Sequence, residues 1–360
     1  MEKRIKIQAE ASLAIKQNKF NCMVNISPRV GKTKLMIDAL NTVSKPIKVL
    51  ILAPLIPIFE SWQKEIIKWK LNPQITVSYC WSNSLKKDKT NYDLIIADEI
   101  HCYSKEVLIE IRKHQFYGCR VVGLTGTLNE STEDFIRGII KIQKVFDYPF
   151  SQAILDGIVA DYQIVCVSCE LDNTNAYIKS GKPPTEFLQT ELQAYKYWDK
   201  RFDDAKEKRL YKQMKNIVSK RANIIYNSQS KLLKTLELVE SIDRTLIFTG
   251  RAEIADKIGQ GSYHGKSNKT NLDKFSKGQL NKLSVISMIS MGITIPDLKT
   301  LVFNQVKSVE ALLVQQVMRA LNMEDGKKGL IYIVYLKNTV DEVWMLNALE
   351  GFDKSKIKFI

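Results

Sequence analysis

Short hydrophobic runs alternate with segments of helical periodicity over the first third of the chain. Five of these runs are predicted to be buried strands, because they are short, apolar and bounded by polar residues. They are residues 22–26, 49–53, 75–80, 94–97 and 121–124. Strands that alternate with helices are typical of a parallel sheet with helices on both faces. This part of the chain is therefore predicted to be an α/β domain.

A second alternation of the same kind begins at residue 232. Its predicted strands are residues 246–249, 285–288, 300–303 and 330–335, with helices between them. A chain of 360 residues that is 45% hydrophobic is long enough for two packed α/β domains. We therefore predict a first domain over residues 1–150 and a second over residues 231–360.

The segment between these domains, residues 151–230, is predicted to hold a linker and a helical insertion. Residues 151–157 resemble a short helix that ends in a glycine turn, and residues 162–169 form an apolar, strand-like run. Residues 185–227 show a strongly charged helical pattern. Outside this segment, residues 130–148 are predicted to be helical, and residues 344–360 to form a helix and a basic tail.

Aromatic residues in the charged helical segment allow two interpretations. They are Phe187, Tyr195, Tyr197, Trp198, Phe202, Tyr211 and Tyr226. The segment is either a nucleic-acid contact arm, or an amphipathic helical pair whose aromatic stripe is buried and whose lysines and arginines face water. We favour the buried stripe for the aromatic residues, and the basic face remains a candidate for phosphate contacts.

A phosphate-binding loop is predicted where the first strand meets the following helix. Residues 27–33, Ser-Pro-Arg-Val-Gly-Lys-Thr, match the end of the pattern G-x-x-x-x-G-K-[ST], with Ile26 in place of the first glycine. Backbone N–H groups of such a loop and of the helix N-terminus face an anion. Lys32 is expected to reach the β- and γ-phosphates, and the Thr33 hydroxyl to hold Mg²⁺.

An acidic pair, Asp98 and Glu99, follows the predicted strand at residues 94–97. Parallel α/β sheets bind their ligands at the carboxyl ends of the strands. A carboxylate at that place can hold Mg²⁺ through water, and its neighbour can polarise the water that attacks the γ-phosphate. Because a phosphate-binding loop precedes it, this pair indicates ATP hydrolysis rather than a solvated acidic turn.

Residues 98–101, Asp-Glu-Ile-His, resemble the DEAH-type box of superfamily two helicases and translocases, and further motifs follow in the family's order. Residues 49–54 with 59–62 resemble motif Ia, 121–127 motif III, 244–250 motif IV, 285–288 with 292–297 motif V, and 315–321 motif VI. The match runs from residue 4 to residue 335 and looks closest to phage recombination and restriction-motor helicases. The resemblance implies two RecA-like domains, ATP and Mg²⁺ as cofactors, and nucleic acid as partner.

The resemblance also implies a role for each matching residue. The catalytic candidates are Lys32, Asp98, Glu99, Gln315 and Arg319. The nucleotide-binding candidates are Gln8 (which would read adenine), Ser27, Pro28, Arg29, Val30, Gly31, Lys32, Thr33, Gly292 and Thr294, with Thr33 and Asp98 holding the metal. The candidates for coupling and nucleic-acid contact are Pro54, His101, Thr125, Thr127, Thr249, Gly250 and His264. His264 is interpreted as a loop residue near the nucleic-acid backbone rather than as a catalytic base.

Motif VI departs from the family pattern at one position. Arg319 matches the first of its two arginines, whereas Asn322 stands in place of the second. An arginine that reaches the γ-phosphate is worth about 10³ to 10⁵ in turnover. Either Arg319 suffices, or a cation among Lys327, Lys328 and Arg251 substitutes, or hydrolysis is slow. We predict slow but real hydrolysis, because the acidic pair is intact. Unchanged ATP turnover in Arg319→Ala would disprove the assignment of Arg319.

Composition agrees with an anionic partner. The net charge is +15 and the sequence pI is about 9.3, which suits a polyanion. No apolar run reaches the roughly 18 residues of a membrane span, and the N-terminal residues lack a signal-peptide pattern, so a cytoplasmic protein is expected. The compact build and the lysine-rich composition suggest a bacterial or phage-infected cell. Of the six cysteines, only Cys166 and Cys169 have metal-like spacing, and they lie in an apolar run. Reduced core thiols are the favoured interpretation.

The leading prediction is an ATP-dependent DNA helicase or translocase, with DNA favoured over RNA because of the likeness to phage and restriction motors. A second hypothesis is an ATP-gated clamp that binds nucleic acid without processive movement. Asn322 favours it, as does the short stretch of residues 72–92, which leaves only residues 82–85 as a remnant of motif Ib. A third is a motor subunit of a larger machine. A small-molecule kinase is disfavoured, because it would have no use for motifs IV to VI.

Overall fold

The chain forms two compact units. The computed structural model describes residues 2–158, 161–181, 184–265, 267, 269–286, 298, 300–306, 328–350 and 352–360. The first unit continues to Asp161, and the second begins at Tyr162. The strand-like run that was predicted as part of the linker segment therefore opens the second unit as β7 (Tyr162–Cys169).

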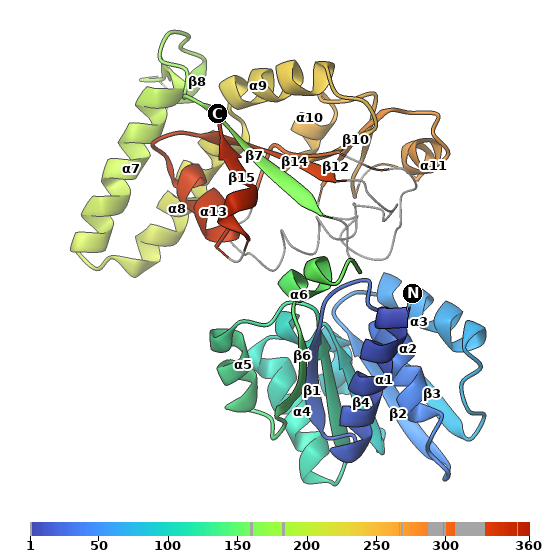
Figure 1. Ribbon diagram of the computed structural model, residues 1–360. Coiled ribbons are helices and arrows are strands. Elements are labelled where there is room, and N and C mark those ends of the chain that lie inside the picture. The colour runs from blue at the N-terminus through green and yellow to red at the C-terminus, as the bar shows by residue number, and fades with distance from the viewer. Residues whose placement is uncertain are drawn as a thin grey trace. The chain divides into compact units, whose positions relative to one another are not determined.

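The first unit is built on a six-stranded, all-parallel sheet with the strand order β3-β2-β4-β5-β1-β6 (Figure 1). Its strands are β1 (Cys22–Ile26), β2 (Ile47–Ala53), β3 (Ile75–Trp81), β4 (Leu94–Asp98), β5 (Arg120–Thr125) and β6 (Lys144–Tyr148). The helices α1 (Glu2–Gln17), α2 (Lys32–Leu40) and α3 (Pro57–Lys68) cover one face, and α4 (Lys105–Phe116) and α5 (Glu130–Arg137) cover the other. Two short 3₁₀ helices, η1 (Ser82–Lys87) and η2 (Ile100–Cys102), and α6 (Phe150–Leu155) complete the unit.

The order of the central strands brings the predicted motifs to one edge of this sheet. Every residue of β1 and of β4 is buried, as expected for strands with helices on both faces. The strand β5 lies between them and pairs with both in parallel. The segments that follow β1, β4 and β5 therefore meet at the carboxyl edge of the sheet.

The second unit is a seven-stranded, all-parallel sheet with the order β11-β12-β10-β13-β14-β7-β15. Besides β7, its strands are β10 (Thr245–Phe248), β11 (Gly261–Tyr263), β12 (Lys282–Val285), β13 (Thr300–Phe303), β14 (Gly329–Leu336) and β15 (Ile357–Phe359). Its helices include α9 (Gln229–Glu240), α10 (Ala252–Ala255), α11 (Thr270–Ser276), α13 (Val340–Ala348) and the 3₁₀ helix η4 (Lys354–Lys356). The predicted fold of two mainly parallel α/β domains is confirmed.

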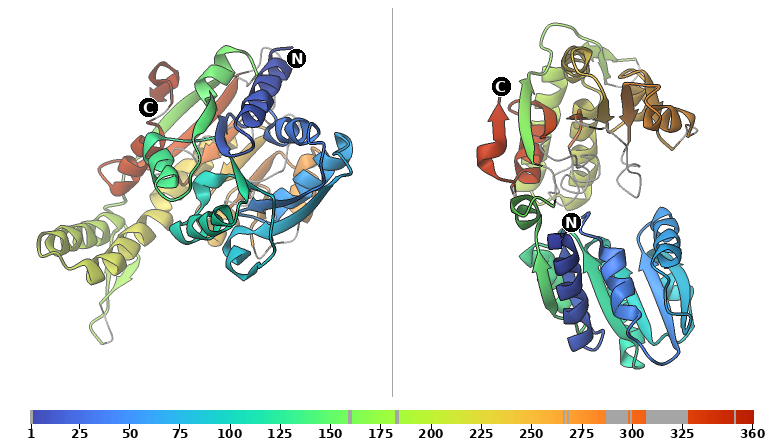
Figure 2. Two further views of the ribbon diagram at one scale, coloured as in Figure 1. Left: turned by 90° about the horizontal axis from the view of Figure 1, so that it is seen from below. Right: turned by 45° about the vertical axis from the view of Figure 1, so that its right-hand side comes forward.

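A helical insertion leaves the second sheet between β7 and α9. It consists of a small antiparallel ribbon, β8 (Ile178–Ser180) and β9 (Phe187–Gln189), followed by the antiparallel helices α7 (Glu191–Glu207) and α8 (Tyr211–Tyr226), which lie side by side (Figure 2). At its base the buried carboxylate of Glu191 accepts hydrogen bonds from Ser228 Oγ at 2.9 Å and Ser230 Oγ at 2.8 Å, next to the N-terminus of α9. A buried ion pair of 2.5 Å between Lys231 and Asp341 joins α9 to α13.

The predicted buried stripe of aromatic residues in this insertion is confirmed only in part, because Trp198 and Tyr226 pack, partly buried, against the hydrophobic cluster that contains Tyr195. Only Tyr195 is buried, where its hydroxyl accepts a hydrogen bond from the backbone N–H of Val340 at 2.7 Å. Three other residues of the set are partly buried, namely Trp198, Phe202 and Tyr226. The remaining three are exposed, namely Phe187, Tyr197 and Tyr211. Smaller residues of the two helices, such as Ala194, Ala205 and Ile217, are also buried.

Two further predictions are wrong. Residues 130–148 are not one helix, because α5 ends at Arg137 and β6 follows as an edge strand that pairs with β1. The predicted basic tail contains β15, which pairs with β7. Both errors concern short strands whose only stabilising partner lies far away in the sequence.

Membrane-spanning helices, metal clusters and the cysteine pair can be judged within the described part of the chain. No helix there is long and apolar enough to span a membrane. No group of His, Cys, Asp and Glu side chains is arranged as a metal cluster. Cys166 and Cys169 are free thiols, and burial raises the pKa of Cys166 to about 12, in agreement with reduced core cysteines.

Candidate nucleotide site

The phosphate-binding loop connects β1 to α2 with strained backbone. Arg29 has a φ of 68° and Gly31 a φ of 106°. The φ of Gly31 is one that residues with a side chain rarely adopt, and a Cβ atom added there would also lie 2.5 Å from Gln8 Nε2, so glycine is favoured at this position. The loop therefore keeps an open concave backbone even though Ile26 replaces the first glycine of the pattern.

Gln8 holds the outer side of this loop. Its side chain is buried on α1, and Nε2 donates a hydrogen bond to the carbonyl oxygen of Val30 at 2.6 Å. The structure thus brings Gln8 to the loop, 22 residues away in sequence. Its predicted contact with adenine stays a prediction.

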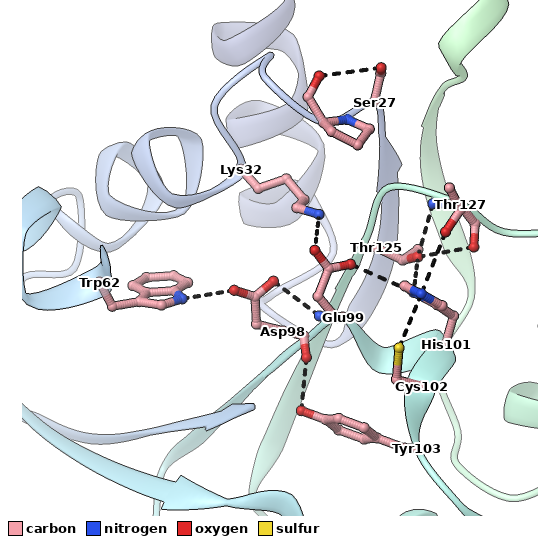
Figure 3. Close-up of polar contacts among 11 residues, drawn as sticks. Ser27, Lys32, Trp62, Asp98, Glu99, His101, Cys102, Tyr103, Thr125 and Thr127 are labelled. Atoms are coloured by element: carbon pink, nitrogen blue, oxygen red, sulfur yellow. Dashed lines mark hydrogen bonds and ion pairs between the residues drawn. The ribbon is translucent and has the colours of Figure 1, made fainter. Parts of the chain in front are cut away.

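Lys32 and the acidic pair meet at the carboxyl edge of the sheet (Figure 3). Lys32 Nζ lies 2.8 Å from Glu99 Oε1, and their side chains are only 13% and 8% exposed. Glu99 has a φ of 51°, a left-handed conformation that is uncommon for a residue with a side chain and is typical of functional sites. The loop lysine and the carboxylate predicted to activate water are therefore in direct contact.

Asp98 is held by two donors. Trp62 Nε1 donates a hydrogen bond to Oδ2 at 2.8 Å, and the backbone N–H of Glu99 donates to Oδ1 at 3.0 Å. Burial, followed by the neighbouring charge of Glu99, raises the pKa of Asp98, while Lys32 lowers it. Two carboxylates here face one lysine, so the site is suited to an additional cation.

His101 connects the acidic pair to the loop after β5. His101 Nδ1 lies 2.8 Å from Thr125 Oγ1 and 3.6 Å from Glu99 Oε2. Its other ring nitrogen, Nε2, lies 3.5 Å from Thr127 Oγ1. The structure therefore brings together three of the residues that were predicted to couple ATP to nucleic acid: His101, Thr125 and Thr127.

The loop after β5 also approaches the phosphate-binding loop. A Cβ atom added at Gly126 would lie 2.9 Å from Pro28 Cδ and 3.3 Å from Lys32 Nζ. Any side chain at residue 126 would therefore disturb Lys32. This close approach explains why a glycine lies between Thr125 and Thr127.

Sequence reasoning missed Tyr103 altogether, and it assigned Trp62 to motif Ia without predicting its contact with Asp98. Trp62, on α3, is 1% exposed and donates to Asp98. The Tyr103 hydroxyl lies 2.7 Å from the carbonyl oxygen of Leu52 and 2.9 Å from that of Asp98, and so ties the ends of β2 and β4 together. An aromatic N–H or O–H that becomes buried needs a polar partner, but the sequence alone does not say which one.

No family model matches the chain, and no curated protein sequence matches it. Several solved structures, however, have a similar fold. Saccharomyces cerevisiae Dbp5 bound to RNA and ADP BeF3 superposes with a TM-score of 0.62 at 11% identity, over 99% of this chain and 89% of that one. The DNA-bound ATP-dependent Type ISP restriction-modification enzyme LlaBIII gives a TM-score of 0.64 at 15% identity, over 99% of this chain and 31% of that one. The Pyrococcus furiosus Hef helicase domain gives 0.52 at 17% identity, over 96% and 97%.

The chain has the tandem RecA-like fold of helicases. This similarity extends over both units, including the second sheet. The fold agrees with the one implied by the motifs. At identities of 11% to 17% the similarity is one of fold.

The remaining predicted residues lie elsewhere. Pro54, after β2, accepts a hydrogen bond from Trp81 Nε1 at 2.8 Å. In the second unit, Thr249 Oγ1 donates to the carbonyl oxygen of Arg251 at 3.3 Å, and His264 Nε2 lies 3.1 Å from Asp256 Oδ1. Gly250 lies against the side chain of Gln305. Five residues lie outside the described part of the chain: Gly292, Thr294, Gln315, Arg319 and Asn322.

We predict that Trp62→Phe destabilises the first unit and weakens catalysis. The substitution leaves a buried carboxylate of Asp98 without one donor, which costs about 1–3 kcal/mol in free energy of unfolding and raises the pKa of Asp98 further. Urea denaturation measures the first effect, and the acid limb of the pH profile of ATP turnover, which should move to higher pH, measures the second. Trp69→Phe, which removes an exposed indole bonded to Glu65, is the matched control and should change neither.

We also predict a pH dependence of stability from His101. Burial lowers the pKa of His101, although the charge of Glu99 opposes the shift. The unfolded state therefore binds a proton more readily, so His101 stabilises the fold above the ordinary histidine pKa of about 6.5 and this stabilisation is lost as the pH falls. The free energy of unfolding between about pH 7.5 and about pH 5.5 should fall less in His101→Gln than in the wild type. Equal falls would contradict the prediction.

Proposed function

We propose that the protein is an ATPase stimulated by nucleic acid, which uses ATP hydrolysis to move along or remodel DNA as a helicase or translocase. The observation that carries the proposal is the meeting of Lys32, Asp98 and Glu99 at the carboxyl edge of a RecA-like sheet. The hydrogen-bonded group of His101, Thr125 and Thr127 beside them supports coupling, since it links the acidic pair to a second loop.

The residues present fit ATP and Mg²⁺. Asp98 is a buried carboxylate with surplus negative charge around it, and Thr33 is the second residue of α2, so these two would hold the metal. When bound, Mg²⁺ neutralises charge that develops on the phosphate oxygens. Lys32 would bind the β- and γ-phosphates in exchange for its contact with Glu99. Glu99 Oε1, released from the lysine, would orient the attacking water and accept its proton.

The second unit would complete the reaction by contributing a cation. Arg319 is our proposed donor, with Gln315 beside it and with Gly292 and Thr294 as further nucleotide contacts. Hydrolysis would then depend on the approach of the two units, which converts turnover into a step along a strand.

Steady-state ATP turnover tests the proposal. It is measured for the protein alone and with single-stranded DNA, duplex DNA, branched DNA and RNA, with Lys32→Ala as the blank. Strong stimulation by a DNA form, reduced by salt, is the expected result. Stimulation by RNA alone would overturn the choice of DNA, and no turnover above the blank would overturn the proposal.

A clamp is the second candidate, and Asn322 is the observation that favours it. With only one arginine in motif VI, the protein would bind nucleic acid in an ATP-dependent way without rapid turnover. ATP-dependent binding in the absence of stimulated hydrolysis would establish this function instead.

A further inference from the structure

We propose that the helical arm, formed by α7, α8 and the turn between them, is a second contact surface for the phosphodiester backbone of nucleic acid. The inference rests on the proposed function, because it names a further surface for the same partner. None of the motifs discussed above lies on the arm. The distribution of charge on α8 and at the end of the arm indicates this contact surface.

The charge of the arm differs between its two helices: α7 carries both acidic and basic residues, whereas the turn and α8 carry only basic ones. No aspartate or glutamate occurs from Lys208 to Leu236, a stretch that includes all of α8. Four exposed cations gather at the free end of the arm and are called the tip cations: Lys208, Arg209, Lys212 and Lys215. None of them forms an ion pair with another residue that the structure describes.

The position of the tip cations agrees with an intermolecular role. They lie on the turn and on the first turns of α8, at the end of the arm opposite the Glu191 contacts that anchor it (Figure 1). Unpaired like charges placed close together repel one another and so destabilise the arm. A polyanion would relieve this repulsion and would release its own counterions on binding.

The surface between the two helices is hollowed, which provides room for a bound phosphate group. A hollow of about 510 Å³ lies between α7 and α8, and its lining includes Tyr197, the three cations Lys200, Arg201 and Lys208, and one carboxylate, Asp204. Arg201 Nη1 donates to the Tyr197 hydroxyl at 2.9 Å, so its guanidinium is held against the aromatic ring. A fixed guanidinium is well suited to phosphate, because less conformational entropy is lost on binding.

Exposed aromatic rings accompany these cations. Tyr211 is 73% exposed and Tyr197 is 47% exposed. Flat apolar faces among cations are typical of surfaces that bind nucleic acid, where they stack on bases or sugars. A helix of 16 residues such as α8 is roughly 24 Å long, which is sufficient to follow several consecutive phosphates.

The test compares three variants of the full chain with the wild type. The tip variant replaces Lys208, Arg209, Lys212 and Lys215 by glutamine. The charge-retaining variant replaces the three tip lysines by arginine. The remote control replaces four exposed lysines near the amino edge of the first sheet or on α4 by glutamine: Lys45, Lys48, Lys113 and Lys141.

Equilibrium binding to labelled duplex, forked and single-stranded DNA and to RNA is measured at several salt concentrations without ATP. The tip variant should bind its best ligand at least about tenfold more weakly, and the slope of log K against log salt should become shallower by about three to four. The charge-retaining variant and the remote control should bind close to the wild type. Circular dichroism should be the same for all four proteins, and no variant should show a lower midpoint of thermal unfolding than the wild type.

Two results would overturn the inference and leave the proposed function intact. One is a tip variant that binds like the wild type, and the other is a remote control that loses as much affinity as the tip variant, because the effect would then be one of net charge. If the wild-type protein binds no nucleic acid at all, the proposed function fails and the inference fails with it.

Discussion

Lys32→Ala is expected to abolish measurable ATP turnover, with a loss of at least about 10²- to 10³-fold. This is the usual effect of removing one preorganised cation or donor that faces developing charge. Lys32 is the loop residue whose Nζ already lies in the acidic site, 2.8 Å from Glu99. Its removal also leaves Asp98 and Glu99 without their neutralising partner, so the pKa of Asp98 should rise further. Steady-state phosphate release measures the effect.

Lys34→Ala is the matched control for this variant. Lys34 lies two residues farther along α2 and pairs with Asp38 at 2.6 Å within the same helix, away from the acidic pair. Its replacement should leave turnover within about twofold, because surface pairs of this kind contribute less than about 1 kcal/mol. Turnover that survives in Lys32→Ala would remove the phosphate-binding loop from the mechanism.

Glu99→Gln is expected to lower turnover by about 10² to 10⁴ while ATP binding is retained. Loss of a positioned general base has an effect of this size, and glutamine keeps the shape of the side chain. The substitution also removes the ion pair with Lys32, so the lysine becomes more available to phosphate. Nucleotide affinity, measured by titration with a fluorescent ATP analogue, should therefore stay equal or become tighter.

The control for the carboxylate is Glu106→Gln. Glu106 lies exposed in the first turn of α4 and interacts with Ser104 rather than with the site. It should keep wild-type turnover. Equal losses of turnover and of ATP affinity in Glu99→Gln would contradict the proposed role, because they would indicate a collapsed site rather than a missing base.

The site was predictable in its local parts. The loop of residues 27–33 and the acidic pair each follow a buried strand, and the alternation of elements implies that such strands are parallel. Their carboxyl ends therefore lie at the same edge of the sheet, however the helices pack on it. The contact between Lys32 and Glu99, 67 residues apart, follows from this rule once β1 and β4 are recognised as strands.

The errors share one cause. The segments 130–148 and 344–360 each contain a strand, β6 and β15, of only a few residues, with no periodicity long enough to distinguish it from a helix or a tail. The prediction for the aromatic residues of the insertion was right only in part for a related reason. Tyr195, Trp198 and Tyr226 pack in one hydrophobic cluster, whereas other aromatic residues of the insertion are exposed. The sequence does not state which part of a helix a neighbouring element covers.

By itself the sequence determined the type of fold and the order of the motifs, because strand and helix periodicity and loop chemistry depend on neighbouring residues. Only the tertiary structure decided that Trp62 supports Asp98, that Gln8 holds the carbonyl of Val30, and that the tip cations gather at the free end of an arm. Each of these depends on which elements pack together. That choice is made by long-range burial of apolar surface, which no local pattern records.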